Sequence, residues 1–430
     1  MKKSDSKFMH PSDQIVLIMS RIYNAGMTST SGGNISILDK NGDMWVTPSA
    51  IDKGTLSDSD IICVKKNGEI KGKYKPSSEY PFHKAIYDAR PDIKAVIHAH
   101  PPALVAFSIV KVLPDTNIFP QAKNVCGDVG FAAYGLPGSD ELGERIAKVF
   151  EQGYNSVIME NHGIVVGGKN LKEAFDRLEM LEFCSNITIN AKNIGTTASL
   201  TDKEIENYEK QSILKIQESK DVDYPSDELA IREEIFKIIL RIFKQGLMNN
   251  MYGTVSARWR GNDFLISPNN INRSEIKRED IVQIKDSKHE ARKTPCRNFK
   301  LHQEIYKQNT HINSIIQTQT PYLMAFGVTG EKIDVRTIPE SWIFLQDMPN
   351  VSFDTHFDEY KSILRLLSQK IPAMIIENDS ILVTGNKLLQ TFDKLEVAEF
   401  SAKSIVIGKH IGNMQPINNE QIEALRENFL

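Results

Sequence analysis

The sequence lacks the marks of disulfide-rich and thiolate-metal proteins. Its 430 residues include only four cysteines, Cys63, Cys126, Cys184 and Cys296, and no two of them form a Cys-x-x-Cys pair. Neither a disulfide framework nor a thiolate zinc site is therefore indicated. Scattered cysteines of this kind are typical of reducing compartments, so we expect a cytoplasmic protein with free thiols.

Long apolar runs and an excess of basic charge are also missing. No apolar run approaches the roughly 20 residues that a membrane-spanning helix needs. The apolar stretch near the N-terminus is interrupted by Ser20 and Arg21, which favours a first helix over a signal peptide. The net charge of −3 and pI near 6.4 give no general attraction to nucleic acid or to anionic membranes. We expect neither as a partner.

What the sequence does contain is an internal repeat. Four blocks recur in the same order at a nearly constant offset, so that position 82 corresponds to 301 and position 175 to 392. The paired blocks are FHKAIY and LHQEIY, AVIHAHPPALVAF and SIIQTQTPYLMAF, ENHGIVVGG and ENDSILVTG, and FDRLEMLEF and FDKLEVAEF. Such agreement indicates two copies of one domain.

The join between the copies is expected in the polar, charged stretch SILKIQESKDVDYPS at 212–226. This boundary predicts two domains, 1–215 and 216–430, and each is long enough to bury its own core. In the first copy, periodicity predicts helices near 139–151 and 171–192, with the strands IKAVIHAH, SVIME and GIVVGG between and beside them. Several strands follow one another with short turns, which favours an α/β or α+β sandwich with a mixed sheet over a doubly wound parallel one.

Two histidines in VIHAHPP are the first candidate for chemistry. Residues two apart on a strand face the same side, so His98 and His100 are expected to point together. His162, in the turn ENHG, can supply a third imidazole, and three histidines with an open fourth position are typical of catalytic zinc. A buried core histidine or a turn histidine bonded to backbone is the alternative for each one alone. No such partners are visible in the sequence for His10 or His83.

A carboxylate and several small polar residues surround these histidines in the sequence pattern. Glu79 follows Ser77 and Ser78 at a helix start, where hydroxyls and backbone N–H groups can hold an anion. Glu79 could also simply favour the helix dipole. The turns SGGNIS and WVTPSA let the backbone approach a ligand through Gly33 and offer the side chain of Ser49. Neither turn is a Walker loop, and each alone is equally typical of an ordinary loop.

Taken in order, the motifs SGGNIS, TPSA, PSSE, HAH and ENHG resemble the class II aldolase/adducin family, most closely its L-fuculose-1-phosphate aldolase type. The resemblance spans the first copy, with the second as a diverged version. It implies, for each copy, an α/β/α sandwich around a mixed, largely antiparallel sheet. It also implies a homo-oligomer, a dimer or tetramer of two-domain chains.

The resemblance further implies roles for individual residues. One Zn²⁺ per chain would be bound in the first copy by His98, His100, His162 and Glu79, with Glu79 also the catalytic acid/base. The substrate phosphate would be held by Gly33, Asn34, Ser49, Ser77 and Ser78. The expected reaction is cleavage of a ketose 1-phosphate to dihydroxyacetone phosphate and an aldehyde, so the expected partner is a small phosphorylated sugar.

Other functions stay open at this point. A sugar-phosphate dehydratase or epimerase of the same family would share the histidines, although the related epimerases carry aspartate at the position of Glu79. A non-catalytic, adducin-like assembly protein would lack the metal ligands. The sequence also departs from the aldolase pattern at Ala50 and at Gln121, where the family has a glycine and a catalytic tyrosine.

The second copy lacks the whole candidate site. Alignment places Gln317, Gln319, Asp379 and Asn298 where the first copy has its three histidines and its glutamate, and YGTVSA where it has SGGNIS. Amides are poor zinc ligands, so we expect no catalytic metal in this copy. Its core pattern persists, which predicts a structural partner that could complete the site of the first copy.

Overall fold

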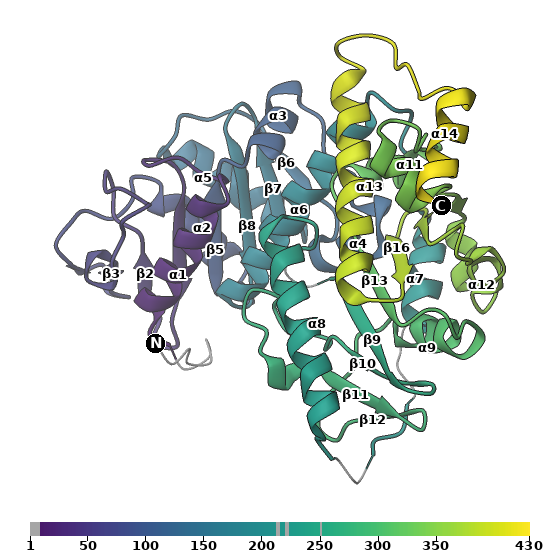
Figure 1. The fold of residues 1–430 in the computed structure, drawn as a ribbon. Helices are drawn as coiled ribbons and strands as arrows, with labels where there is room; N and C mark the ends of the chain where they lie inside the picture. Colours follow the sequence, from purple (N-terminus) through teal and green to yellow (C-terminus); the bar gives the residue numbers. More distant parts are fainter. Residues whose placement is uncertain (1–8, 212–215, 220–222, 250–251) are drawn as a thin grey trace. The chain divides into compact units, whose positions relative to one another are not determined.

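The computed structural model describes residues 9–211, 216–219, 223–249 and 252–430. The chain divides into two compact units, Met1–Thr116 with Gln121–Asn186, and Asn117–Pro120 with Ile187–Leu430 (Figure 1). The segment 187–211 therefore belongs to the second unit, although it precedes the second sequence repeat. Part of the expected join at 212–226 lies outside the described residues, and the boundary at 215 stays a prediction.

The first unit is built on an eight-stranded sheet in the order β4-β3-β2-β1-β5-β8-β7-β6. Its strands are β1 (Asn34–Leu38), β2 (Met44–Val46), β3 (Ile62–Val64), β4 (Ile70–Lys71), β5 (Ala95–Ala99), β6 (Gly130–Ala132), β7 (Ser156–Met159) and β8 (Gly163–Gly168). All described pairings are antiparallel except β6 with β7. Consecutive strands joined by short turns produce this pattern, as the sequence predicted.

Six helices accompany this sheet: α1 (Pro11–Asn24), α2 (Tyr80–Ala89), α3 (Pro102–Val110), α4 (Pro120–Cys126), α5 (Asp140–Glu151) and α6 (Leu171–Ala191). Helices α2 and α5 bury Phe82 and Phe150 in one cluster with Val96 of β5. Side chains alternate along a strand, so His98, two residues after Val96, faces the same side as helix α2. The sheet thus directs the histidine toward the first turn of α2.

The second unit repeats this order element by element. Its strands are β9 (Thr254–Arg260), β10 (Asp263–Ile266), β11 (Val282–Lys285), β12 (Lys288–His289), β13 (Ser314–Thr318), β14 (Asn350–Val351), β15 (Ala373–Ile376) and β16 (Ser380–Gly385). Their order, β12-β11-β10-β9-β13-β16-β15-β14, is that of the first sheet. The predicted fold class and tandem duplication are confirmed.

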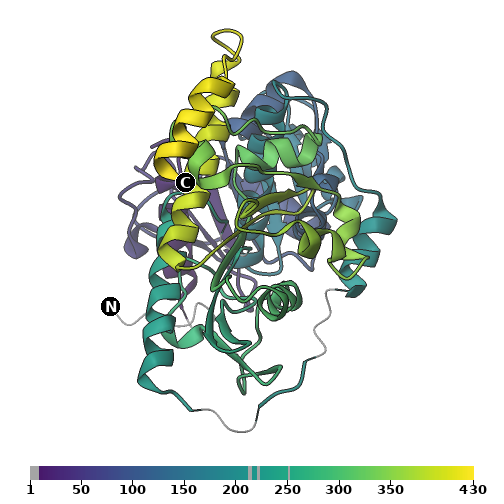
Figure 2. The ribbon, with the colours of Figure 1, turned by 45° about the vertical axis from the view of Figure 1, so that its right-hand side comes forward.

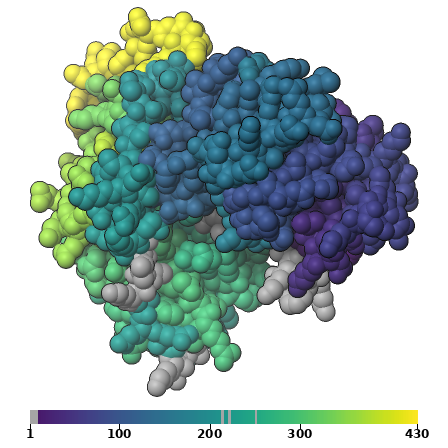
Figure 3. Space-filling view, turned by 180° about the vertical axis from the view of Figure 1, so that it is seen from behind, coloured from purple at the N-terminus to yellow at the C-terminus, as the bar shows by residue number. Residues whose placement is uncertain are grey.

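The helices of the second unit are α7 (Asp202–Gln211), α8 (Ser226–Lys244), α9 (Phe299–Gln308), α10 (Leu323–Thr329), α11 (Pro339–Leu345), α12 (Lys361–Leu366), α13 (Leu388–Gly408) and α14 (Asn419–Phe429). Helices α8 and α13 pack together and against the second sheet (Figure 2). The main loss relative to the first unit is in α12, which has 6 residues where α5 has 12. Side chains fill the space between the ribbons of each unit (Figure 3).

The strand register corrects one detail of the repeat alignment. Asn34 lies opposite His98, and Thr254 lies opposite Gln317. Thr254 is therefore the counterpart of Asn34, and the segment aligns one residue earlier than a letter-by-letter match of SGGNIS with YGTVSA. Backbone pairing decides this because a one-residue shift would turn every side chain to the other face of the sheet.

The structure bears on two predictions, one drawn from the scattered cysteines and one from the lack of long apolar runs. All four cysteines are free and buried, in agreement with the expectation of free thiols. Among the described residues, no helix is both long enough and apolar enough to cross a membrane.

Candidate metal and active site

Three histidines from two segments of the chain converge in the first unit. His98 lies on β5, His100 follows that strand, and His162 lies in the turn between β7 and β8. Their ligand atoms all lie within 4.8 Å of one another, and the Nε2 atoms of His98 and His100 are 3.0 Å apart. Within the described residues, this is the one group of three or more potential ligands close enough to share a metal ion.

Glycines allow this close approach of backbone and imidazole. A Cβ atom on Gly163 would lie 2.6 Å from the Ala99 carbonyl oxygen and 2.7 Å from His100 Cδ2. A Cβ on Gly32 would lie 2.7 Å from His100 Nδ1. Contacts this short are excluded for carbon, so His100 can occupy its position only because both neighbours have no side chain.

The Glu79 carboxylate faces the same point as the histidines. Its Oε2 lies 3.4 Å from His98 Nε2, and its Oε1 lies 3.6 Å from His162 Nε2. Asn34 donates a hydrogen bond of 2.8 Å to Oε2. Oε1 is buried and has no hydrogen-bond partner among the described residues. A buried carboxylate oxygen without a partner is costly, which indicates a missing ligand at this point.

A buried series of side-chain hydrogen bonds leads from Glu79 through Asn34 into the core of the unit. Asn34 contacts His83 through its side-chain oxygen, at 2.5 Å from Nε2. His83 Nδ1 lies 2.7 Å from the hydroxyl of Ser36, which also lies 2.7 Å from the hydroxyl of Tyr87. No role for His83 was predicted from the sequence, and the structure shows that it holds Asn34, which in turn orients Glu79.

Burial keeps the three candidate ligands neutral. Desolvation lowers the pKa of His98 well below its usual value, and the neighbouring His100 and His162 lower it further. Desolvation and His162 lower the pKa of His100 to about 4. Burial also lowers the pKa of His162, against the opposing effect of Glu79. Neutral imidazole is the form that binds a metal ion.

The donor set fits a divalent zinc-like ion. Zinc–nitrogen bonds of about 2.0–2.1 Å in tetrahedral geometry place ligand atoms roughly 3.3 Å apart, close to the 3.0 Å between the Nε2 atoms of His98 and His100. His98 Nδ1 lies 3.0 Å from the carbonyl oxygen of Ile164, to which it can donate a hydrogen bond. Such a bond fixes the ring so that Nε2 faces the site, as in metal-bound histidines generally.

The residues expected to hold a phosphate lie beside this group. An isolated bridge between Pro48 and Pro76 brings the turn with Ser49 next to Ser77 and Ser78. Ser77 is buried and its Oγ accepts a hydrogen bond from the backbone N–H of Glu79, whereas Ser78 is exposed. Gly33 has a φ of 69°, and a Cβ there would lie 2.8 Å from the His98 carbonyl oxygen.

Asn34 differs from the others because its side chain is already engaged within the protein. Its amide nitrogen donates to Glu79 and its oxygen contacts His83. Gln121 lies at the start of α4 with only 3% of its surface exposed.

In the second unit the corresponding position holds a network of hydrogen bonds. Gln317 donates to Ser380 at 2.8 Å, and Gln319 donates to the backbone oxygen of Asp379 at 2.7 Å. Asp379 accepts a hydrogen bond of 2.8 Å from the hydroxyl of Tyr208, on α7. The side chains that replace the histidines are bonded to their neighbours and do not converge on one open point.

Comparison with known proteins gives the family. The sequence profile described as "Class II Aldolase and Adducin N-terminal domain" matches residues 13–189 and again residues 233–406. Two matches cover most of the chain, and the chain belongs to this family, with two copies of its domain in tandem.

Individual relatives match somewhat less than half of this chain, over nearly their full length or a large part of it. The chain is 32% identical to a 5-deoxy-D-ribulose 1-phosphate aldolase of Bacillus thuringiensis, over 46% of this chain and 93% of that protein. It is 34% identical to an L-fuculose phosphate aldolase of Methanococcus maripaludis, over 42% and 97%. It is also 34% identical to a 3-oxo-tetronate 4-phosphate decarboxylase of Pectobacterium atrosepticum, over 39% and 79%.

Among solved structures, an L-fuculose 1-phosphate aldolase is similar at 33% identity and a TM-score of 0.43, over 47% of this chain and 95% of that one. Relatives with these names are lyases and decarboxylases, and the family membership supports an enzyme.

Proposed function

We propose that the first copy is a metal-dependent aldolase that cleaves a ketose 1-phosphate into dihydroxyacetone phosphate and an aldehyde. The observation that carries the proposal is the convergence of three neutral imidazoles and the unpartnered Oε1 of Glu79 on one point. A Zn²⁺ held there by His98, His100 and His162 would supply positive charge to the ketone and neighbouring hydroxyl oxygens of the sugar. Relatives named as sugar-phosphate aldolases support the substrate class.

Glu79 would handle the proton on carbon. Its Oε2 is held by Asn34, which leaves Oε1 free to face the substrate. When the carbon–carbon bond breaks, the hydroxyl of the departing carbon gives up its proton to solvent and becomes the aldehyde carbonyl. The electron pair of the broken bond passes toward the ketone oxygen, and the three-carbon fragment then takes up one proton at the carbon that lost its neighbour. A carboxylic acid at Oε1 can deliver that proton and recover it in the reverse direction.

The phosphate would be held by the backbone and hydroxyls at Gly33, Ser49, Ser77 and Ser78. These groups come from two turns and the start of α2, and the Pro48–Pro76 bridge holds the turn with Ser49 next to Ser77 and Ser78. Fixing the phosphate holds the reacting carbons in place and removes much of the entropy cost of the reaction. Since the Asn34 side chain is engaged by Glu79 and His83, we assign it to positioning Glu79 in addition to its expected place near the phosphate.

A decarboxylase is the second candidate, favoured by the relative of that name at equal identity. Loss of carbon dioxide from a 3-oxo acid also leaves an electron pair that passes to a ketone oxygen, so the same site would stabilise the charge. The two reactions differ in the leaving group, which is an aldehyde in one and carbon dioxide in the other.

A substrate panel decides between them. The full chain, loaded with Zn²⁺, is incubated with ketose 1-phosphates of varied stereochemistry and with 3-oxo-tetronate 4-phosphate. Release of dihydroxyacetone phosphate together with an aldehyde from a ketose 1-phosphate supports the aldolase. Carbon dioxide release from the keto acid alone would replace it with the decarboxylase. Turnover unaffected by the double substitution His98→Ala, His100→Ala would overturn both.

A further inference from the structure

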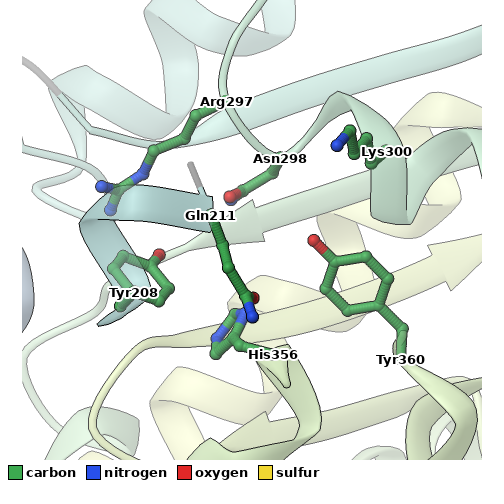
Figure 4. A pocket seen from close by; sticks show the side chains of 7 residues that line it. All are labelled: Tyr208, Gln211, Arg297, Asn298, Lys300, His356 and Tyr360. Atoms are coloured by element: carbon green, nitrogen blue, oxygen red, sulfur yellow. The ribbon is translucent and has the colours of Figure 1, made fainter. Parts of the chain in front are cut away.

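A small pocket in the second unit lies where the sequence repeat places the counterpart of the active site. It has a volume of about 30 Å³ and is lined by Tyr208, Arg297, Asn298, Lys300, His356 and Tyr360, among others (Figure 4). Since one water molecule needs about 10–15 Å³ of such space, the pocket has room for a group of a few heavy atoms. Arg297 and Asn298 stand where the first copy has Ser78 and Glu79.

Arg297 brings a cation to this pocket and is held there by aromatic rings. Its guanidinium carbon lies 5.0 Å from the ring centre of Tyr208 and 5.4 Å from that of Tyr252. Its Nη1 lies 3.7 Å from Glu209, which is beyond hydrogen-bond distance. Stacking between rings fixes the guanidinium without using its N–H donors, so these can face an oxyanion even though Glu209 and Asp379 lie near its charge.

His356 offers a second donor, whose nearest charged neighbour is the carboxylate of Asp379. The side chain is 7% exposed, and its Nε2 has no hydrogen bond to any residue that the structure describes. Nε2 lies 3.5 Å from Asp379 Oδ2, but that carboxylate accepts hydrogen bonds from Tyr208 and Ser380. A buried nitrogen that forms no hydrogen bond within the described residues can still donate one to an acceptor in the pocket.

Lys300 supplies the third donor, at the exposed side of the pocket. In the described part of the chain it forms no ion pair, whereas Lys307 on the same helix, α9, is paired with Glu304 at 2.8 Å. Figure 4 shows the hydroxyl of Tyr360 and the side chain of Asn298 directed toward the middle of the pocket, where the side chain of Gln211 also lies. Donors of several kinds thus surround one small volume.

We infer that this pocket binds a small oxyanion of the phosphate class, free phosphate or the phosphate group of an ester, without a metal ion. Arg297, His356 and Lys300 donate to its oxygens, and Tyr360 and Asn298 complete the shell. The second copy is then a binding domain in its own right, in which a guanidinium and an amide, those of Arg297 and Asn298, take the place of the first copy's serine and glutamate. This inference is independent of the reaction proposed for the first copy.

Calorimetric titration of the full chain with inorganic phosphate, after metal removal by a chelator, tests the inference. We expect Lys300→Gln to weaken phosphate binding by about fivefold and His356→Gln by about tenfold, because each removes one charge-assisted or buried hydrogen bond. Lys307→Gln is the matched control and should leave the dissociation constant unchanged. Circular dichroism establishes that each variant is folded.

The Ser78→Ala variant distinguishes phosphate binding in the first unit from binding in this pocket, because it alters only the expected phosphate position of the first copy. Phosphate binding that survives Ser78→Ala and is weakened by Lys300→Gln supports the inference. Binding abolished by Ser78→Ala and unchanged in Lys300→Gln and His356→Gln would overturn it, as would the absence of any binding. Parallel titration with glycerol 3-phosphate identifies the source: tighter binding than phosphate supports an ester ligand, and weaker binding supports the free anion.

Discussion

The two carboxylate oxygens of Glu79 have different surroundings, and this difference assigns proton transfer to one of them. Oε2 accepts a hydrogen bond from Asn34, while Oε1 is buried without a partner beside His162. Glu79→Gln keeps the size of the side chain and removes its ability to carry a proton. We expect kcat to fall by roughly 10²–10⁴-fold, the usual contribution of general acid–base catalysis. Steady-state kinetics of the zinc-loaded chain measures it.

A matched control is Glu144→Gln, on the exposed side of α5. It should leave kcat unchanged, and both variants should keep the metal. A Glu79→Gln enzyme with kcat within about fivefold of the unsubstituted chain would remove Glu79 from the proton transfer.

Asp379 allows a prediction about pH. Burial alone would raise its pKa, but His356, Arg297 and the hydrogen bond from Ser380 outweigh burial and hold the pKa well below the ordinary value of 3.8. A depressed pKa in the folded state means stabilisation that is present above 3.8 and is lost as the pH falls toward the folded-state pKa.

Asp379→Asn should therefore lower the unfolding free energy of the second unit by about 3 kcal/mol at pH 7, because it leaves Arg297 without its buried counter-charge. The difference should shrink as the pH falls below about 4. Urea unfolding of both chains at several pH values measures it. A difference that stays constant from pH 7 to pH 3 would contradict this role for the Asp379 charge.

Single residues also show what the sequence could and could not predict. His98, His100 and His162 were recognisable because a strand period of two and a glycine turn place imidazoles in a known pattern. His83 was missed because its partner Ser36 lies 47 residues away, on a strand whose pairing no local pattern reveals. The one available signal was that a histidine recurs at this position in both copies, in FHKAIY and LHQEIY.

At the scale of elements, the same buried contact joins a strand to a helix in both units. Ser36 of β1 bonds to His83 and Tyr87 of α2, and Ser256 of β9 bonds to His302 and Tyr306 of α9 at the same distances of 2.7 Å. The second unit keeps this contact although its candidate metal ligands are gone. The contact therefore supports the fold, and only in the first unit does it also support Asn34 and Glu79.

Ser36→Ala and Ser256→Ala form a matched pair that separates these two effects. Each should lower the unfolding free energy of its own unit by about 1–3 kcal/mol, because each leaves buried donors without a partner. Only Ser36→Ala should also lower kcat. Thermal unfolding and steady-state kinetics of the two variants are compared directly. An equal loss of kcat in both would show that the relay does not position Glu79.

The elements themselves were largely predictable. The helices expected at 139–151 and 171–192 are α5 (Asp140–Glu151) and α6 (Leu171–Ala191), because apolar periodicity marks the buried face of a long helix. The offset of one residue at β9 was not predictable, since register is set by pairing with β13 across the sheet. The pocket of the second unit was also missed, because the residues that line it come from α7, the start of α9 and the segment around His356.

At the scale of the molecule, a segment of the first repeat completes the second unit. Leu200, Ile205 and Tyr208 form a buried cluster with Phe353, and Tyr208 bonds to Asp379. A chain cut at the repeat boundary would lose this cluster. We expect residues 192–430 to unfold at a higher urea concentration than residues 216–430. The unfolding free energy of the longer fragment should be larger by several kcal/mol, since burying each large apolar side chain contributes about 1.5–3 kcal/mol.

Equal urea midpoints for the two fragments would show that α7 and the preceding segment add nothing to the second unit. Residues 192–430 with Ile205→Ala provide the control for specific packing, because the segment is present but one buried side chain is truncated. Its midpoint should lie between those of the other two fragments.

The two copies share one fold but differ in chemistry, and the difference is concentrated in the histidines of the first. Metal content therefore tests the account most directly. Elemental analysis of the purified full chain, dialysed against zinc and then freed of loosely bound ions, should find one divalent ion per chain, and none after His98→Ala with His100→Ala. Two ions per chain, no ion, or one ion retained in the double variant would contradict the account.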